Sequence, residues 1–194
     1  GKYNVAIGQY AMQYYTSAEN NIAIGKNALA AVTTPTYNTA IGHSAGSAIT
    51  TGAKNVLIGR YNGNENNLDI RTSSNNIVLS DGDANIRMRI DSSGNVGIGT
   101  TSPADGLELS HVNPKIRIRE SDVTNGFADI LYNSTRLRIR SRNNAANGGI
   151  AFEGQAGSTI TEYARFDSSG RVGIGTTSPS GTLHISGGSS TFKL

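Results

Sequence analysis

The chain has 194 residues and a formal net charge of +3 at pH 7. Hydrophobic residues make up 36%, below the usual share of about 45–50%, and with no Trp and four Phe the large side chains that fill a thick globular core are scarce. The lack of Cys excludes disulfide and thiolate chemistry, the mild positive charge does not indicate nucleic-acid binding, and no apolar run reaches the roughly 18 residues of a membrane span. Because 24 residues are Gly, we expect an all-β chain of short strands and many turns.

A repeat occupies the first third of the chain. Segments of the form Asn, apolar, small or apolar, Ile, Gly begin at residues 4, 21, 38 and 55, a constant spacing of 17. A fixed period of this length is typical of one structural unit stacked on copies of itself. We therefore predict one coil per repeat over residues 1–66, with adjacent strands about 4.8 Å apart.

The side chains of each repeat alternate between two faces. Val5 and Ile7 point to one face of a strand and Ala6 to the other. Because the same Ile recurs in every copy, we expect that face to be buried, whereas the following Gly permits a positive φ or a close backbone approach and the Asn residues can hydrogen-bond along the stack. These predicted packing and close-approach residues are Ile7, Ile24, Ile41 and Ile58, and Gly8, Gly25, Gly42 and Gly59.

A second repeat is longer. Residues 91–103 recur as residues 167–179, an offset of 76. Residues 87–91, a turn at 92–94 and residues 95–99 predict a β-hairpin, and Gly on both sides of one Ile suggests that another backbone lies close by. The residues concerned are Ile98 and Ile174 for packing, and Gly97, Gly99, Gly173 and Gly175 for close approach.

Alternation with period two marks the remaining strands. Residues 115–119, 127–132, 136–140, 149–152 and 162–166 alternate apolar with polar side chains and are separated by Asn- and Gly-rich turns. This pattern is typical of an antiparallel meander with one wet face. We divide the chain into residues 1–66 (repeat stack), 67–110 (small meander and first GIGTTSP hairpin), 111–165 (meander) and 166–194 (second hairpin and a last strand).

These residues resemble a known family. The string GNVGIGTTSP at 94–103 and its second copy at 170–179 look like the shafts of bacteriophage tail fibres, where such a string often precedes an endosialidase-type intramolecular chaperone. The repeats of residues 1–66 are similar to viral fibre repeats and to the head repeats of trimeric autotransporter adhesins. The matching stretches cover a little over half of the chain, and GIGTTSP is the more specific motif.

The resemblance implies a parallel homotrimer. A thin coil with few large residues cannot bury enough surface alone, whereas three copies around an axis can bury their Ile rows together. The expected fold class is therefore all-β: an elongated parallel homotrimer with a β-roll- or β-prism-like repeat stack followed by small antiparallel β-meander units.

Candidate catalytic and metal-binding groups are weak. His43 and His184 occupy positions that hold other polar residues in the other repeats, so both are expected to face solvent, as is His111 beside its Pro-containing turn. Residues 81–85 resemble the start of a calcium loop but lack its sixth-position Gly and closing Glu, and we interpret them as a hairpin turn. Carboxylates that could in principle form a glycosidase pair are Glu120, Asp129, Glu153 and Glu162. We predict no catalytic residue, metal or cofactor.

A run of Arg residues is the sharpest binding candidate. Alternation places Arg136, Arg138 and Arg140 on one strand face. Arg forks suit carboxylate and phosphate groups, so this face could contact an anionic cell-surface glycan. The alternative is a solvated edge whose charges pair with Glu120, Asp122 and Asp129 and discourage aggregation.

We therefore expect a structural and adhesive segment of a viral tail fibre, which places or contributes to host-receptor binding on the virion. The expected partners are the chain itself and a host polysaccharide or protein receptor, with no nucleic acid and no membrane insertion. One alternative is a trimeric adhesin on a bacterial surface, and another is a tailspike that depolymerises polysaccharide.

Overall fold

The computed structural model is all-β and describes residues 2–119, 127–133, 136–142, 149–156 and 158–187, among which no helix occurs and so none that could span a membrane. The all-β prediction is confirmed. The chain divides into two compact units, Gly1–His111 and Val112–Leu194, and each is described by itself.

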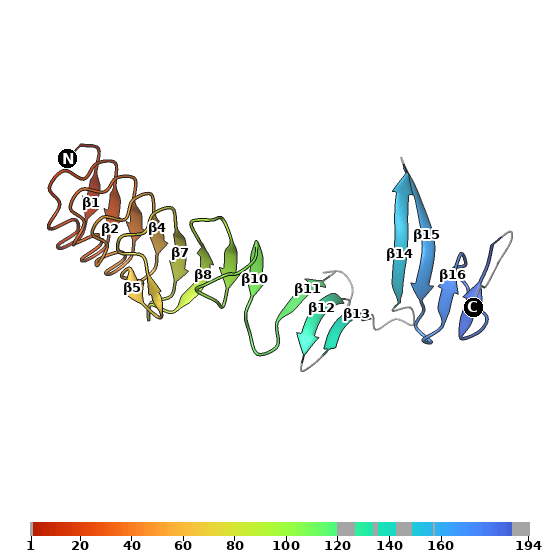
Figure 1. Cartoon of the computed structure of the whole chain (residues 1–194). Coiled ribbons are helices and arrows are strands. Elements are labelled where there is room, and N and C mark those ends of the chain that lie inside the picture. The colour runs from red at the N-terminus through yellow and green to blue at the C-terminus, as the bar shows by residue number, and fades with distance from the viewer. Residues whose placement is uncertain (1, 120–126, 134–135, 143–148, 157, 188–194) are drawn as a thin grey trace. The chain divides into compact units, whose positions relative to one another are not determined.

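The first unit begins with one coil per repeat (Figure 1). The strands β1 (Val5–Ile7), β2 (Ile22–Ile24), β3 (Thr39–Ile41) and β4 (Val56–Ile58) pair in parallel, and each residue lies opposite its equivalent in the next repeat. The predicted stack of coils is confirmed. The turns are also bonded from coil to coil, for example where the Leu29 N–H donates to the Ala45 carbonyl at 2.9 Å.

The stack continues beyond residue 66, which the 17-residue spacing did not predict. Strand β7 (Ile77–Ser80) pairs in parallel with β4, with Ile77 opposite Val56. The preceding coil is longer because it contains a small hairpin of β5 (Asn64–Glu65) and β6 (Leu68–Asp69). This insertion shifts the next Asn out of the period, and Ser80 replaces the usual Gly, so the fifth rung is hidden in the sequence.

Antiparallel strands complete the sheet. Strand β8 (Ile86–Ile90) pairs with β7 and with β9 (Val96–Ile98), which confirms the first predicted hairpin. Strand β10 (Leu107–Leu109) then pairs with β9 in parallel. The result is one mixed eight-stranded sheet in the order β1-β2-β3-β4-β7-β8-β9-β10.

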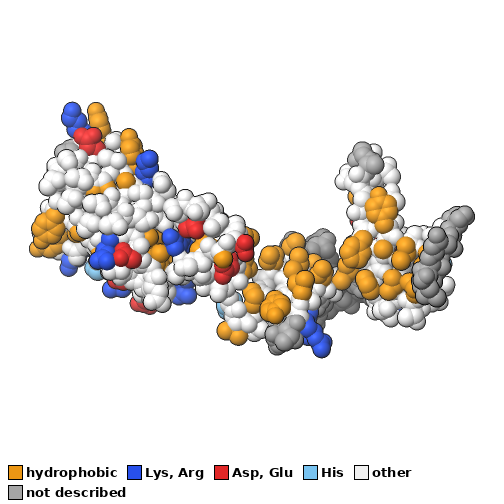
Figure 2. All heavy atoms as spheres, viewed as in Figure 1, with side chains coloured by type: hydrophobic (Ala, Val, Ile, Leu, Met, Phe, Trp, Pro, Cys, Tyr) orange, Lys and Arg blue, Asp and Glu red, His pale blue; other side chains and the backbone are white. Residues whose placement is uncertain are grey.

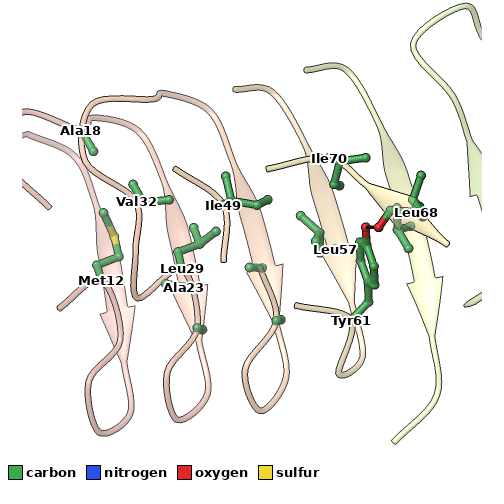
Figure 3. Packing of buried hydrophobic residues seen from close by; sticks show 14 residues of the cluster. Met12, Ala18, Ala23, Leu29, Val32, Ile49, Leu57, Tyr61, Leu68 and Ile70 are labelled. Carbon is green, nitrogen blue, oxygen red and sulfur yellow. Dashed lines mark hydrogen bonds between the residues drawn. The ribbon is translucent and has the colours of Figure 1, made fainter. Parts of the chain in front are cut away.

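The hydrophobic core of this unit lies inside the coils (Figure 3). Small or medium side chains fill each coil at equivalent positions, as Leu29 follows Met12 and Ile49 follows Val32, and all four are at most 2% exposed. Tyr61 fills the wider last coil, where its hydroxyl donates to the Leu68 carbonyl at 2.8 Å and desolvation raises its pKa. The coils are narrow, so many small contacts replace one thick core.

A ladder of buried asparagines runs along the stack. Asn21, Asn38, Asn55 and Asn76 are each fully buried. The backbone N–H of each donates to the Oδ1 of the Asn one coil earlier, starting at Asn4, at 2.9 Å in every case. The ladder satisfies backbone groups that the coil turns leave without strand partners, and it confirms the expected bonding between stacked Asn residues.

The second unit contains two smaller sheets, and the alternating pattern predicted their strands but not this division. Strands β11 (Lys115–Arg119), β12 (Phe127–Asn133) and β13 (Arg136–Arg142) form an antiparallel meander. Strands β14 (Ile150–Ala156), β15 (Thr159–Phe166) and β16 (Val172–Ile174) are also antiparallel, and β17 (Leu183–Ile185) joins β16 in parallel. The set β14–β17 therefore repeats the strand order and directions of β7–β10.

Candidate functional site

The repeated Ile residues lie on the outside of the coils, so the chain itself does not bury them. Ile7, Ile41 and Ile58 are 58%, 39% and 45% exposed, and Ile24 is partly exposed. The middle residue of each strand points inward instead, as Ala23 and Ala40 do at 0% exposure. Leu57 takes the same inward position in β4, so the alternation places the Ile outside. Packing of these Ile residues against other copies stays a prediction.

The outward face of the eight-stranded sheet is apolar from end to end. Residues that lie opposite one another in neighbouring strands point to the same face of the sheet. Two rows of such residues therefore cross all eight strands. Every member except Thr39 is apolar. The rows are Val5, Ile22, Thr39, Val56, Ile77, Ile90, Val96 and Leu107, and Ile7, Ile24, Ile41, Ile58, Leu79, Met88, Ile98 and Leu109. We call this surface the outer apolar face.

The glycines after the Ile residues hold neighbouring coils close together. Gly8, Gly25, Gly42 and Gly59 have φ between +110° and +135°. A Cβ on Gly42 would overlap the Gly59 carbonyl, so no other residue fits this contact. In the hairpin motifs, a Cβ on Gly97 or Gly173 would meet a Thr carbonyl at 2.7 Å, and one on Gly99 or Gly175 would overlap a Ser carbonyl.

The Arg residues of β13 share a sheet face with those of β11. Across the meander, Lys115, Leu131 and Arg138 lie in one row, and Arg117, Asp129 and Arg140 lie in the next. Asp129 is 1% exposed, and Arg117 binds it through two hydrogen bonds of 2.7 and 2.9 Å, which raise the Arg117 pKa.

The structure describes the surroundings of two of the three Arg residues proposed on β13. Arg136 and Arg138 are exposed, whereas the side chain of Arg140 and the residues Glu120 and Asp122 lie outside the described set. Asp129 lies on the central strand β12. The ion pair described on this face joins Asp129 to Arg117 of β11. The outer edge of β13 thus presents guanidinium groups to solvent.

The other face of the same meander is apolar and exposed. Ile116, Ile130 and Ile139 lie opposite one another in the three strands and are 48%, 51% and 57% exposed. Tyr132 and Leu137 continue this face in the next row. A sheet with one apolar and one basic face has no core of its own on the apolar side.

The β14–β17 sheet also has an exposed apolar face. Ile150, Phe166, Val172 and Leu183 lie opposite one another across its four strands. Figure 2 shows hydrophobic side chains gathered over this part of the chain. Ile174 and Ile185 are 42% and 38% exposed in the neighbouring row.

Aspartates cap the hairpin turns. The Oδ1 of each accepts the backbone N–H groups two and four residues later at 2.8–3.0 Å. At Asp81, hydrogen bonds from the Asn85 side chain and from Arg87 lower the carboxyl pKa to about 2. Residues 81–85 thus form a turn whose carboxylate is already occupied by protein donors. The three caps are Asp81, Asp91 and Asp167, and the pKa of each is lowered.

The remaining candidate groups do not converge. His43 and His111 are exposed, and the Nδ1 of His184 accepts the Ser180 N–H at 3.3 Å. Glu162 is held by Arg165 through two hydrogen bonds of 2.6 Å, and Glu153 is exposed. Within the described ranges, no three His, Asp or Glu side chains lie together as a metal site would require.

Comparison with known proteins gives no matching family model and no matching curated protein.

Proposed function

We propose that this chain is a segment of a trimeric structural and adhesive fibre, of the kind that forms the shafts of bacteriophage tail fibres. The observation that carries the proposal is the outer apolar face, which crosses eight paired strands with Thr39 as its one polar member. Monomeric soluble proteins rarely expose continuous apolar patches larger than a few hundred Å², and larger patches mark interaction sites.

A second copy of the chain is the partner that best fits this face. The rows are straight and repeat once per coil, so a parallel copy would place equivalent residues at equal heights. A closed threefold arrangement would bury all three faces around an axis and leave no surface for further addition. The apolar faces of the β11–β13 and β14–β17 sheets support the same arrangement, because each sheet needs a cover.

The role that follows is mechanical. Stacked coils transmit load through backbone hydrogen bonds and the Asn ladder, and no chemistry is required of the side chains. Asp129 and Glu162 are each bound by two nitrogens of one Arg, which favours charge pairing over acid–base catalysis. We expect a depolymerisation assay on bacterial capsule to be negative. Nearby tail genes or a membrane-anchor domain in the genome would separate a tail fibre from a bacterial trimeric adhesin.

Mass photometry at nanomolar concentration tests the trimer. We expect a particle of three chains, and negative-stain images should show a thin rod. Ile41→Ala should loosen the trimer, because it opens three cavities in one layer at roughly 2–5 kcal/mol each. The matched control is Tyr37→Asn, since Tyr37 is 59% exposed, is not a member of the outer apolar face, and has Asn20 at its position one coil earlier. A stable folded monomer of the parent chain would refute the proposal.

The basic edge of β13 is the proposed contact for an anionic host glycan. Arg136 and Arg138 are exposed, and Arg140 follows them on the same strand face. We expect that Arg138→Glu weakens binding to a sulfated or carboxylated polysaccharide and that salt weakens binding of the parent. Unchanged binding after combined reversal of Arg138 and Arg140 would remove this role from the strand.

A further inference from the structure

The two copies of the hairpin motif differ at one buried contact. In the first copy, Arg89 lies on the inward face of β8, where its Nη2 donates to the Asn76 side-chain oxygen at 2.9 Å and its Nη1 donates to the Thr101 carbonyl. The Arg89 guanidinium thereby bridges the Asn76 carboxamide and the Thr-Thr-Ser-Pro loop. This contact joins the end of the Asn ladder to the hairpin motif.

The second copy lacks the carboxamide. Ile150 pairs with Phe166 as Ile77 pairs with Ile90, so Gly149 stands where the first copy has Asn76. The Arg at the equivalent position, Arg165, instead binds Glu162 through Nε and Nη2 at 2.6 Å. Among the described residues, no acceptor lies within hydrogen-bond distance of its Nη1.

A hollow of about 570 Å³ lies beside Gly149 and Arg165. It is lined by the start of β14 (149–151), the end of β15 with its turn (165–168), Arg171, and the loop at 177–179. A Cβ on Gly149 would meet the Phe166 carbonyl at 2.7 Å, so the backbone itself keeps the position without a side chain.

The charges of the lining favour a neutral polar ligand. Arg165 and Arg171 are balanced by Glu162 and Asp167, with which they form ion pairs of 2.6 and 2.7 Å. Paired guanidinium and carboxylate groups offer both donors and acceptors, which suits a ligand with several hydroxyl groups better than a simple anion. Pro179 adds apolar surface on which a sugar ring can pack.

We infer that this hollow binds a saccharide unit carrying an acetamido group. The first copy shows the kind of group that this Arg can bind, since Arg89 donates to the side-chain carbonyl oxygen of Asn76. The acetamido group of an N-acetylated sugar presents the same carbonyl oxygen to Arg165, and its hydroxyl groups meet Thr177 and Ser178. The inference deepens the adhesive part of the proposed function by assigning one ligand class to one site.

The test compares matched glycosides on the purified 194-residue chain by saturation-transfer NMR and titration. Methyl N-acetyl-β-glucosaminide and its galacto isomer are compared with the corresponding methyl glycosides, which carry a hydroxyl in place of the acetamido group. We expect dissociation constants on the order of 1 mM for the acetamido sugars and about tenfold weaker binding of the plain glycosides.

Variants locate the site. Arg165→Met should weaken acetamido-sugar binding about tenfold, whereas Arg60→Met, at an exposed position of the coil stack, should leave it unchanged. Arg171→Asn introduces the residue of the first copy, Asn95, whose backbone N–H donates to Asp91 as that of Arg171 donates to Asp167. We therefore expect this variant to keep the fold and to weaken sugar binding. Three results would each overturn the inference. Neither acetamido sugar binds, the plain glycosides bind equally well, or folded Arg165→Met and Arg171→Asn bind the acetamido sugars as tightly as the parent.

Mass photometry of the same samples keeps the two proposals separate. A trimer that binds no acetamido sugar would refute the site alone. A monomer that binds one through Arg165 would refute the fibre proposal and leave the site standing.

Discussion

Removing one rung of the Asn ladder should destabilise the coil stack strongly. Asn38 is fully buried, its Oδ1 accepts the Asn55 N–H at 2.9 Å, and its Nδ2 donates to the Gly52 carbonyl at 2.9 Å. Asn38→Ala leaves both backbone groups without these partners in a place with no room for bulk water. Each buried unsatisfied group costs about 1–3 kcal/mol, so we expect a loss of about 2–6 kcal/mol in the free energy of unfolding.

Two control variants show whether burial sets the size of the effect. Asn4→Ala removes the first rung, where Asn4 is only partly buried and water can replace it, so the loss should be smaller. Lys26→Ala changes an exposed side chain one coil away and should stay within about 0.5 kcal/mol of the parent.

Urea denaturation followed by circular dichroism measures the stability, and amide hydrogen exchange at Asn55 measures the local opening. Exchange at Asn55 should accelerate in Asn38→Ala much more than exchange in the hairpin of β8 and β9. If Asn38→Ala is no more destabilising than Lys26→Ala, the ladder does not stabilise the stack and the reasoning fails.

Three further changes probe other contacts. Gly42→Ala should cost at least about 2 kcal/mol, because φ is +135° and the new Cβ overlaps a backbone carbonyl, whereas Gly82→Ala meets no atom within 4 Å and should be neutral in the same urea titration. Hydrogen bonds led by that from Asn85 hold the Asp81 pKa at about 2, below its unfolded value, so this stability is present above about pH 4 and is lost as the pH falls toward 2. Asp81→Ala should therefore flatten the acid limb of a stability–pH curve, and an unchanged limb would exclude this carboxylate as a contributor. Arg89→Met should lower the thermal midpoint, since it removes the hydrogen bonds that join the last rung of the ladder to the hairpin loop; an unchanged midpoint would mean that these bonds contribute no net stability.

Much of the local structure could be predicted from repeated residues. The spacing of Asn4, Asn21, Asn38 and Asn55 predicted one coil per repeat, and the turn after residue 91 predicted the hairpin that recurs 76 residues later. These predictions succeeded because each depends on backbone geometry at Asn and Gly, which neighbouring elements hardly alter. The fifth rung at Ile77 was missed, since the inserted hairpin breaks the period while the parallel pairing persists.

The candidate sites were less accessible to prediction. Period-two alternation separates two faces of a strand but does not state which face is inside the coil, and the recurring Ile indicated a buried face without stating whether the chain itself or another copy covers it. The tertiary structure decides which face is inside, because Ala23 and Ala40 lie within the coils and Ile24 and Ile41 lie outside. Likewise, Arg89 and Arg165 look equivalent in the aligned motifs, and only the strand register shows that one faces Asn76 and the other Gly149.

The sequence by itself therefore determined the repeating units, their turns and their strand directions, since these follow from local conformational preferences. The tertiary structure decided which side chains are buried, how the Asn ladder passes into the hairpin motif, and where a hollow opens. These features depend on the space left between elements distant in the chain, and no local pattern encodes that space.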